Sequence, residues 1–285
     1  MTEQDARGLV EILNKHSPLV HLETVVSALL AMHADMILSA ERYSDPRSLG
    51  RYRAQVYSQN GEDGIIAEIM RRIGTTNKHF VEIGAGDGDE NNTRLLVENG
   101  WTGIWLESDP ANVATIRETY ASEIVDGRLT LISSSATREN VARSLADEVG
   151  PDLLSVDIDA NTSHVWRALK HLRPRVAVIE YNPAFGPVID WEITYRPDAT
   201  WNGDNQFGAS LCRLETIGRE LGYGLVGCDI TGVNAFFVRD DLLGEKFHPP
   251  FTSLQHFEPA RFALLQCTIA HPQAKRPRKQ QETAP

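Results

Sequence analysis

The spacing of apolar residues predicts two kinds of structure along the chain, helical at the start and mixed strand and helix after residue 78. Between residues 5 and about 43 the apolar positions recur three and four apart, as in Val25, Leu29, Met32 and Met36. This spacing predicts two amphipathic helices joined near Ser17-Pro18. Such an N-terminal arm can pack on the main domain, cover a binding site, or form a contact between two copies, and the pattern leaves all three open.

Farther along, short apolar runs alternate with segments of helical spacing. The expected strands are 80–83, 103–107, 129–132, 153–158, 176–180, 224–228 and 234–238. Helices are expected at 93–99, 111–120 and 140–149. The alternation predicts right-handed crossovers and a mostly parallel sheet. Only 229–233 separates the last two runs, which is too short for a crossover helix, so these two strands must form an antiparallel hairpin.

The elements divide the chain into an N-terminal helical arm (1–50), an α/β domain of Rossmann-like type (51–268) and a flexible tail (269–285). A length of 285 residues suits this division. The net charge of −11 leaves the chain without the positive field that would attract nucleic acid or an anionic membrane, so neither partner is expected. Scattered cysteines, an acidic start and the lack of a long apolar run predict a cytoplasmic protein.

A glycine-rich turn follows the first expected strand. The stretch 79–88 reads His-Phe-Val-Glu-Ile-Gly-Ala-Gly-Asp-Gly, and its glycines allow a sharp backbone turn where a side chain would block a ligand. Glu107 ends the next strand, at about the 20-residue offset at which a carboxylate meets ribose hydroxyls in dinucleotide folds. Together the two features predict a site for a nucleoside cofactor. A plain tight turn is the structural alternative.

Three further stretches, added to the glycine-rich turn and Glu107, carry a family resemblance. About residues 55–240 resemble the class I S-adenosylmethionine (SAM) dependent methyltransferases, and more narrowly their FkbM-like branch. These stretches are Ser58-Gln59-Asn60-Gly61-Glu62-Asp63, Asn91-Asn92-Thr93, and 222–237. The resemblance implies a seven-stranded sheet with an antiparallel terminal hairpin, and SAM as cofactor. It implies that Glu82 lies near the methionine amino group, Gly84 and Gly86 near the methionine and ribose portions, and Glu107 at the ribose hydroxyls.

The full set of expected cofactor-binding residues is Gln59, Glu82, Gly84, Gly86, Asp87, Glu107, Ser135 and Asp157. One position departs from the family. Many relatives place an acidic residue after the third strand to contact the adenine amine, whereas this chain has Ser133-Ser134-Ser135-Ala136. A serine hydroxyl or a backbone carbonyl can take over that contact. Gln59 and Glu62 can reach the cofactor from the segment before the first strand, and Ser58 can equally cap a helix that starts nearby.

Oxygen-bearing side chains follow the fourth and fifth strands, where ligands of open α/β sheets bind. Alternation along a strand puts Asp157 and Asp159 on one side, and likewise Glu180 and Asn182. An all-oxygen set suits Mg²⁺ or Mn²⁺ rather than zinc, and Asp159, Glu180 and Asn182 are the expected metal ligands. The alternatives are that Asp157 is a buried supporting residue and that the acidic group holds a substrate amine without a metal.

Methyl transfer from SAM requires mainly alignment of the acceptor and removal of a proton. The expected catalytic residues are Asp159, His164 and Asn182. His248 and His256 are further candidate bases, and each of these histidines can instead be structural. The irregular segment 185–208 is expected to carry substrate specificity. Aromatic residues expected to line the pocket are Tyr181, Trp191, Tyr195 and Trp201.

The sequence therefore predicts a SAM-dependent methyltransferase that acts on a polar small molecule, at oxygen and with help from a divalent cation, in biosynthetic tailoring as the FkbM-like resemblance implies. Two alternatives remain. One is metal-free N-methylation of a small amine steered by Asp159 or Glu180, and the other is a non-catalytic SAM-binding or partner-binding module. A homo-oligomer formed through the arm is also expected. An NAD-dependent oxidoreductase is disfavoured by the glycine spacing and by the terminal hairpin.

Overall fold

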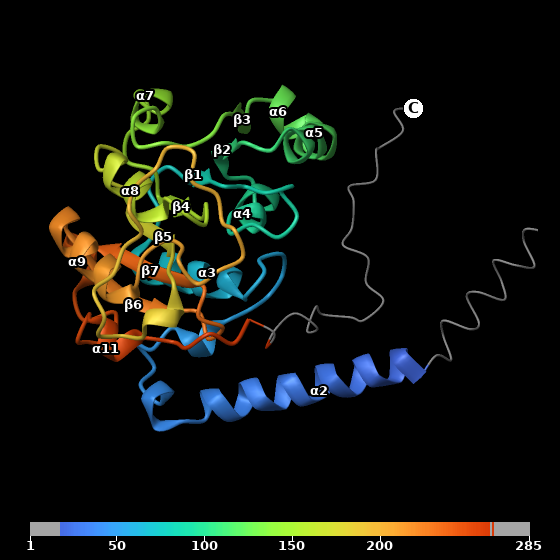
Figure 1. Ribbon diagram of the computed structural model, residues 1–285, viewed down its shortest axis with the longest axis vertical. Helices are drawn as coiled ribbons and strands as arrows, with labels where there is room; N and C mark the ends of the chain where they lie inside the picture. Colours follow the sequence, from blue (N-terminus) through green and yellow to red (C-terminus); the bar gives the residue numbers. More distant parts are fainter. Residues whose placement is uncertain (1–17, 263, 265–285) are drawn as a thin grey trace, which may run out of the picture.

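A computed structural model describes residues 18–262 and 264, with side chains from residue 25 onward. One sheet runs through it in the strand order β3-β2-β1-β4-β5-β7-β6 (Figure 1). Its strands are β1 (His79–Ile83), β2 (Thr102–Glu107), β3 (Leu129–Ser133), β4 (Leu153–Val156), β5 (Val176–Glu180), β6 (Tyr223–Cys228) and β7 (Asn234–Arg239). Strands β1 to β5 are parallel, and β7 pairs antiparallel with both β5 and β6. This is the class I methyltransferase fold, and the predicted sheet with its terminal hairpin is confirmed.

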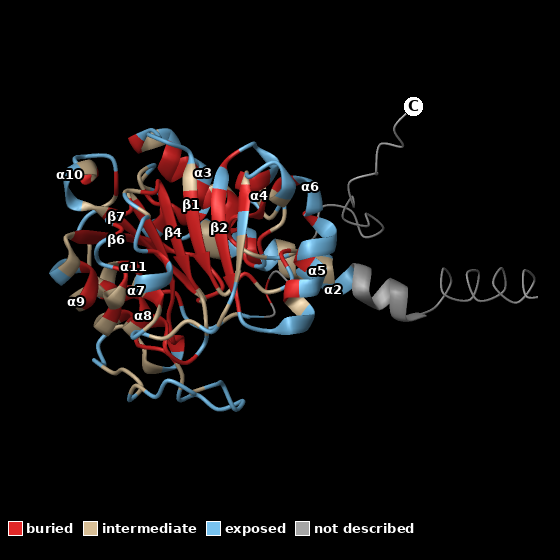
Figure 2. Ribbon diagram, turned by 90° about the horizontal axis from the view of Figure 1, so that it is seen from above, coloured by how far each residue is buried: buried red, intermediate tan, exposed pale blue. Residues whose placement is uncertain are grey.

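Apart from the edge strand β3, the strands are almost wholly buried because helices cover both faces of the sheet (Figure 2). Alternate residues of a strand point to opposite faces. Val81 of β1 packs in a core cluster that includes residues of α8 (Thr162–Ala168) and α9 (Leu211–Leu221). Its neighbour Phe80 packs on the other side with α3 (Glu62–Ile73). Between these layers, the carboxyl ends of the parallel strands meet at one edge of the sheet.

The remaining helices of the domain are short. They are η1 (Glu41–Tyr43), η2 (Gly50–Tyr52), α4 (Arg94–Glu98), α5 (Pro110–Thr119), α6 (Ala121–Val125), α7 (Val141–Ser144), η3 (Pro183–Phe185), α10 (Asp240–Leu243) and α11 (Ser253–His256). The helix expected at 140–149 is only the single turn α7, because Val141 and Leu145 are its only buried apolar residues and Val149 is exposed. The fourth strand ends at Val156 rather than 158, because the backbone turns at Asp159, which has a φ of 57°.

The second of the two expected arm helices is present as α2 (Pro18–Leu38), while the first lies outside the described residues, as does the tail 269–285. One side of α2 packs on the domain, where Ala34 lies in a small cluster with Ile230 and Leu264. The helix runs along one end of the molecule (Figure 1). No helix within residues 18–262 and 264 is both long and apolar enough to cross a bilayer.

Candidate functional site

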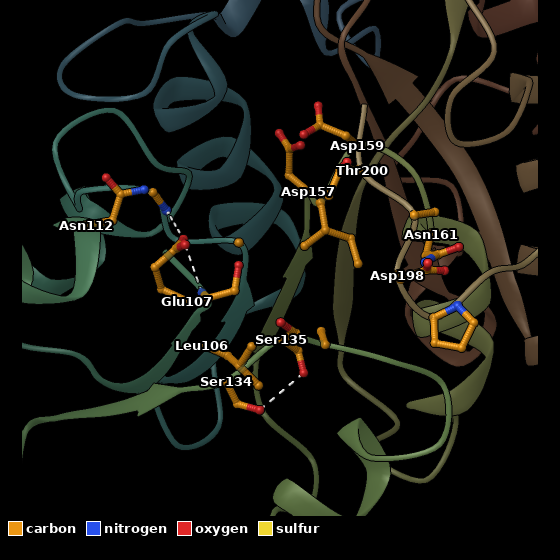
Figure 3. A pocket seen from close by; sticks show the side chains of 17 residues that line it. Leu106, Glu107, Asn112, Ser134, Ser135, Asp157, Asp159, Asn161, Asp198 and Thr200 are labelled. Atoms are coloured by element: carbon orange, nitrogen blue, oxygen red, sulfur yellow. Dashed lines mark hydrogen bonds between the residues drawn. The ribbon is translucent and has the colours of Figure 1, made fainter. Parts of the chain in front are cut away.

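A pocket of about 510 Å³ lies beyond the carboxyl ends of β1 to β4, and we call it the main pocket (Figure 3). Several segments contribute to its walls: Gly84 and Gly86, the end of β2 with Asn112, Ser134 to Ala136 after β3, Asp157 to Asp159 with Asn161 after β4, and Pro197 to Thr200. The last of these belongs to residues 186–208, the irregular segment after β5, which we call the covering segment. That it carries substrate specificity stays a prediction. None of the described residues of α2 lines it.

The glycine turn allows β1 and β4 to approach each other closely. A Cβ atom on Gly84 would lie 1.8 Å from the backbone oxygen of Asp157, so a side chain cannot be accommodated there. Gly86 has a φ of 59°, in the left-handed region that favours glycine. The turn therefore brings backbone rather than side chains to the pocket wall.

Glu107 ties the glycine turn to the end of β2. Its Oε2 accepts a hydrogen bond from the backbone N–H of Gly86 at 2.8 Å, and its Oε1 accepts from the N–H groups of Ser108 and Asp109 at 2.8 and 2.7 Å. The side chain lines the main pocket (Figure 3). Two carboxylate oxygens provide about four acceptor positions, so Glu107 retains capacity to accept from a ligand hydroxyl.

Ser134 and Ser135 form the wall next to β3. The backbone oxygen of Ser135 accepts from the Asn140 side chain at 2.8 Å and from the Ser134 hydroxyl at 3.2 Å. Ser135 thus lines the pocket as expected, but its carbonyl is already bonded, which leaves the hydroxyl for a ligand.

Three carboxyl groups converge at the ends of β4 and β5. Asp157 and Asp159 line the main pocket, and both point to the same side of it (Figure 3). Glu180 lies behind them, where its Oε2 accepts from the backbone N–H of Asp159 at 3.1 Å and from the Thr162 hydroxyl at 3.2 Å. The left-handed backbone of Asp159 aims that N–H at Glu180.

The three carboxyl groups hold their protons more tightly than usual. Burial, followed by the nearby charge of Asp157, raises the pKa of Glu180 well above its ordinary value. Burial also raises the pKa of Asp157 to about 6 and raises that of Asp159. Asp157 and Glu180 are hydrogen bonded to each other, so one proton shared between them relieves the repulsion.

Glu82 is buried, and its carboxyl group anchors the segment after the glycine turn. It accepts from the Asn91 side chain at 2.6 Å, from the backbone N–H of Asn92 at 2.9 Å and from the Thr93 hydroxyl. Ser155 also bonds to it. Burial raises the pKa of Glu82 to about 7. Glu82 does not line the main pocket but a smaller cavity beside it.

We call this smaller cavity the acidic hollow. It holds about 40 Å³ and shares Gly84 and Asp157 with the main pocket. Its other lining residues are Gln59, Asn60, Glu62, Glu82, Glu90, Asn91, Asn92 and Asn234. Gln59, an expected cofactor residue, thus lies at the hollow. Gly61, not Ser58, occupies the N-cap position of α3, but the Ser58 hydroxyl accepts from the backbone N–H of Asp63 in the first turn of this helix at 3.0 Å.

Asn182 and His164, two expected catalytic residues, hold the covering segment instead of lining the main pocket. The Asn182 amide nitrogen donates to the backbone oxygens of Asn205 and Phe207 at 2.8 and 2.9 Å, and its oxygen accepts from the Ala184 N–H at 3.0 Å. His164 Nε2 bonds to the backbone oxygen of Ile193 at 2.9 Å. The expectation that Asn182 ligates a metal, or that His164 acts as a base at the pocket, therefore needs correction, because local bonds occupy both side chains.

Asp87 also differs from expectation. Its side chain is exposed and accepts from the backbone N–H of Asp89 at 3.0 Å, so it stabilises a turn and lines neither cavity. The candidate bases His248 and His256 lie together at a separate small cavity against β6. Burial lowers the pKa of His256 to about 4. Neither histidine lines the main pocket.

The expected aromatic residues do not line the main pocket either. The Tyr181 hydroxyl donates to the backbone oxygen of Glu258 at 2.6 Å, inside the core. Trp191 stacks on Phe185, and Tyr195 packs against His164. These contacts stabilise the covering segment, so its aromatic content reflects its own folding.

Glu62, which the sequence places within reach of the cofactor, and Asn234, which it does not single out, both lie in stretches that carry the family resemblance. Glu62 begins α3, and Asn234 begins β7 directly beside Glu180 in the sheet register. The Asn234 amide nitrogen donates to Glu62 Oε1 at 2.8 Å. Because the two residues are 172 positions apart, no local pattern could have paired them.

The expected metal set is not assembled. Asp159 and Glu180 lie together, but Asn182 is engaged elsewhere. Within the described part of the chain, no group of three or more His, Cys, Asp or Glu residues is arranged to hold a metal ion.

No family model matches the chain, and no curated protein matches it. Solved structures match at low identity. A presumed O-methyltransferase from Klebsiella pneumoniae is 20% identical over 73% of this chain and 96% of its own, with a TM-score of 0.44. A presumed sarcosine dimethylglycine methyltransferase from Galdieria sulphuraria is 18% identical over 41% of this chain and 44% of its own, with a TM-score of 0.33.

An O-methyltransferase from neocarzinostatin biosynthesis, solved with S-adenosyl-L-homocysteine and 1,4-dihydroxy-2-naphthoic acid, is 14% identical over 62% of this chain and 52% of its own, with a TM-score of 0.37. The chain thus spans about half the length of two of these three proteins. At such identities the matches concern the fold alone.

Proposed function

We propose that the chain is a SAM-dependent methyltransferase that acts on a polar small molecule bound over the ends of β4 and β5. The observation that carries this proposal is the main pocket, which runs from Ser135 past Glu107 and the glycine turn to Asp157 and Asp159. This order fits a nucleoside at one end and a methyl acceptor at the other. The FkbM-like resemblance supports a polar small-molecule acceptor in biosynthetic tailoring.

Proton removal from the acceptor falls to Asp157. A carboxyl group with a pKa of about 6 is suited to accept a proton from a hydroxyl near neutral pH. Glu180 supports it, because the hydrogen bond between the two carboxyl groups fixes the orientation of Asp157. Asp159 lies at the same wall and adds negative charge toward a polar acceptor.

Calorimetry with SAM, S-adenosylhomocysteine and NAD tests the cofactor. We expect binding of the first two and not of NAD. Glu107→Gln should weaken S-adenosylhomocysteine about 10- to 100-fold, the usual effect of losing a charge-assisted hydrogen bond. An exposed glutamate of α4, changed in Glu98→Gln, is the matched control. Absence of SAM binding by the wild-type chain would refute the proposal.

Cation-assisted O-methylation is the second candidate, and the raised pKa values of Asp157, Asp159 and Glu180 favour it. Carboxyl groups that hold protons in the protein alone can give them up to a divalent cation. Transfer of labelled methyl should be measured before and after EDTA, and again with added Mg²⁺ or Mn²⁺. Activity that survives EDTA supports the metal-free form, and loss restored by the cation supports the second candidate.

The methylated atom distinguishes O-methylation from N-methylation. The many carboxyl groups at the main pocket would also suit an amine acceptor, which Asp159 or Glu180 would steer. Incubation of the protein with labelled SAM and small-molecule extracts of its source, followed by mass spectrometry of the product, identifies the acceptor. A methyl ether supports transfer to oxygen, and a methylated amine supports the alternative.

A further inference from the structure

The wall of the main pocket carries negative charge and no positive charge. Four carboxyl side chains line the pocket, and its described lining residues include no lysine, arginine or histidine. Two of the four have partners within the protein: Glu107 accepts from three backbone N–H groups, and Asp157 is hydrogen bonded to Glu180. The other two, Asp159 and Asp198, therefore carry the charge that a ligand meets first.

Asp159 and Asp198 lie at one end of the pocket but belong to different segments. Asp159 follows β4, whereas Asp198 belongs to the covering segment. Neither side chain has a hydrogen bond or an ion pair with any described residue. Like charges at one end of a pocket repel each other unless a positive charge lies with them. An anionic ligand is thus disfavoured at this end, and a cationic one is favoured.

Asn161 is an independent sign of a ligand at the same end. It lines the main pocket and is only 3% exposed. Its amide nitrogen donates to the backbone oxygen of Arg196 at 2.8 Å, which fixes the orientation of the amide because its oxygen cannot donate. Asn161 is the N-cap residue of α8, yet its oxygen makes none of the usual capping bonds. Oδ1 is therefore buried and without a partner among the described residues, and a donor from a ligand would satisfy it.

The bond from Asn161 to Arg196 also holds the chain directly before Asp198. Pro197 restricts the backbone between these two residues of the covering segment. Figure 3 shows Asn161 and Asp198 together on the side of the pocket opposite to Glu107. None of the three oxygen-bearing residues at this end lines the acidic hollow, so the two places are separate.

We propose that this end of the main pocket binds a protonated amino group of the methyl acceptor. Asp159 and Asp198 supply the negative charge, and Oδ1 of Asn161 accepts one N–H bond of the amino group. The inference rests on the proposed function and narrows its polar small molecule to a cationic one. A protonated amine has no free lone pair, so this group orients the acceptor while a different atom of it receives the methyl group.

Three probes of similar length test which charge this end accepts: putrescine is cationic, butanediol is neutral and succinate is anionic. Ligand-observed NMR titrations use the full chain saturated with S-adenosylhomocysteine, which fills the place of the cofactor. EDTA is present, so that no divalent cation competes. We expect putrescine to bind at least about 10-fold more tightly than butanediol, and succinate to show no binding.

Two substitutions locate the site. Asp198→Asn keeps the shape and removes the charge, and it should weaken putrescine binding about 3- to 10-fold, because an exposed charge is partly screened. Asn161→Ala removes the unpartnered oxygen and should weaken putrescine binding about 10-fold. In both variants the preference for putrescine over butanediol should fall.

Two further variants serve as controls. Asp147→Asn makes the same chemical change at an exposed position outside the pocket and should leave putrescine binding unchanged. Asn182→Ala removes other bonds of the covering segment, so it should affect putrescine and butanediol alike and measures loosening alone. Circular dichroism melts verify that each variant is folded.

Equal binding of the three probes, or putrescine binding that survives both Asp198→Asn and Asn161→Ala, would overturn the inference. So would a loss of putrescine and butanediol affinity by the same factor in these two variants, because loosening of the covering segment explains it. If the wild type binds no S-adenosylhomocysteine, the proposed function fails, and the same titrations on the protein alone still decide the inference.

Discussion

At the scale of single residues, Glu82 shows how burial changes the role that a motif suggests. The resemblance places this carboxyl group near the methionine amino group of SAM. In the structure it instead receives donors from Asn91, Asn92, Thr93 and Ser155. Thr93 in turn accepts from the indole N–H of Trp105 at 2.7 Å, so Glu82 links β1 to β2 through the start of α4. Its position next to the glycines is thus explained by folding as much as by ligand binding.

Glu82→Ala should therefore reduce stability strongly. The change leaves several buried donors without an acceptor, each of which costs about 1–3 kcal/mol. We expect the free energy of unfolding in urea to fall by about 3 kcal/mol or more. Glu98→Ala, at an exposed position of α4, should change it by less than about 0.5 kcal/mol. If Glu82→Ala leaves the stability unchanged but weakens SAM binding, Glu82 contacts the ligand directly and the structural role is wrong.

Glu62 should make stability depend on pH. Burial, with the nearby charge of Asp229, raises its pKa from 4.5 to about 7, so between these values the folded chain keeps a proton that the unfolded chain releases. The associated stability is complete below about pH 4.5 and is lost as the pH rises to about 7. Glu62→Gln has no such proton. Relative to wild type, this variant should gain on the order of 1 kcal/mol between about pH 5 and about pH 8.

Urea unfolding at several pH values measures this gain as a difference between the two proteins, which cancels the contributions of other groups. One such group is His256, whose lowered pKa acts in the opposite direction. Glu98→Gln should follow the wild-type curve. Parallel curves for Glu62→Gln and wild type would show that Glu62 is ionised in the folded chain.

At the scale of elements, the strands follow from sequence far better than the site does. Val176–Glu180 is predicted to the residue, and six other strands agree within two residues at each end, because most of them are buried on both faces and therefore read as continuous apolar runs. The places of Glu107 and of the glycine turn in the main pocket could be predicted for a similar reason, since both depend on the local backbone at the end of a strand. The bonds that Asn182 makes could not be predicted, and its expected role needed correction, because its partners lie in an irregular segment whose path no periodicity describes.

The covering segment 186–208 is held by Asn182, His164 and Asn161. Asn161 donates to the backbone oxygen of Arg196 at 2.8 Å, directly before the residues that line the main pocket. Asn182→Ala should release the bonds to Asn205 and Phe207, so backbone amides of 193–208 should exchange with deuterium about tenfold faster. Asn202→Ala, at an exposed position in the same segment, is the control. Unchanged exchange in Asn182→Ala would show that other contacts fix the segment.

At the scale of the whole molecule, two segments of the chain, one near each end of the described region, meet at the buried carboxyl group of Glu258. Glu258 accepts from the Tyr43 hydroxyl at 2.5 Å and pairs with Arg42 at 3.1 Å and Arg261 at 2.8 Å. The segment after α2 is thereby fastened to the segment after α11. This attachment fixes the position of α2 on the domain, so the outer side of α2 is presented in a defined direction.

That outer side is an apolar stripe of Val25, Leu29, Met32 and Met36, each more than half exposed. Their spacing of four, three and four is that of residues at a helix–helix seam. Residues 18–38 contain no lysine or arginine, and the chain carries a net charge of −11, so an anionic membrane is a poor partner. A second copy of the chain presents the same stripe, which allows a twofold pairing of the two α2 helices.

We therefore expect light scattering after size exclusion to give the mass of a dimer at tens of micromolar. Leu29→Glu combined with Met32→Glu should shift the mass to that of a monomer. Pairing of the two stripes would then bury glutamates of both copies in an apolar seam, where their like charges repel. Val125→Glu with Val149→Glu makes the same chemical change at two other exposed positions and should leave the dimer intact. A monomeric wild type, or a dimer that survives the α2 substitutions, would exclude α2 as the interface. S-adenosylhomocysteine binding should be the same in both variants, since none of the described residues of α2 lines the main pocket.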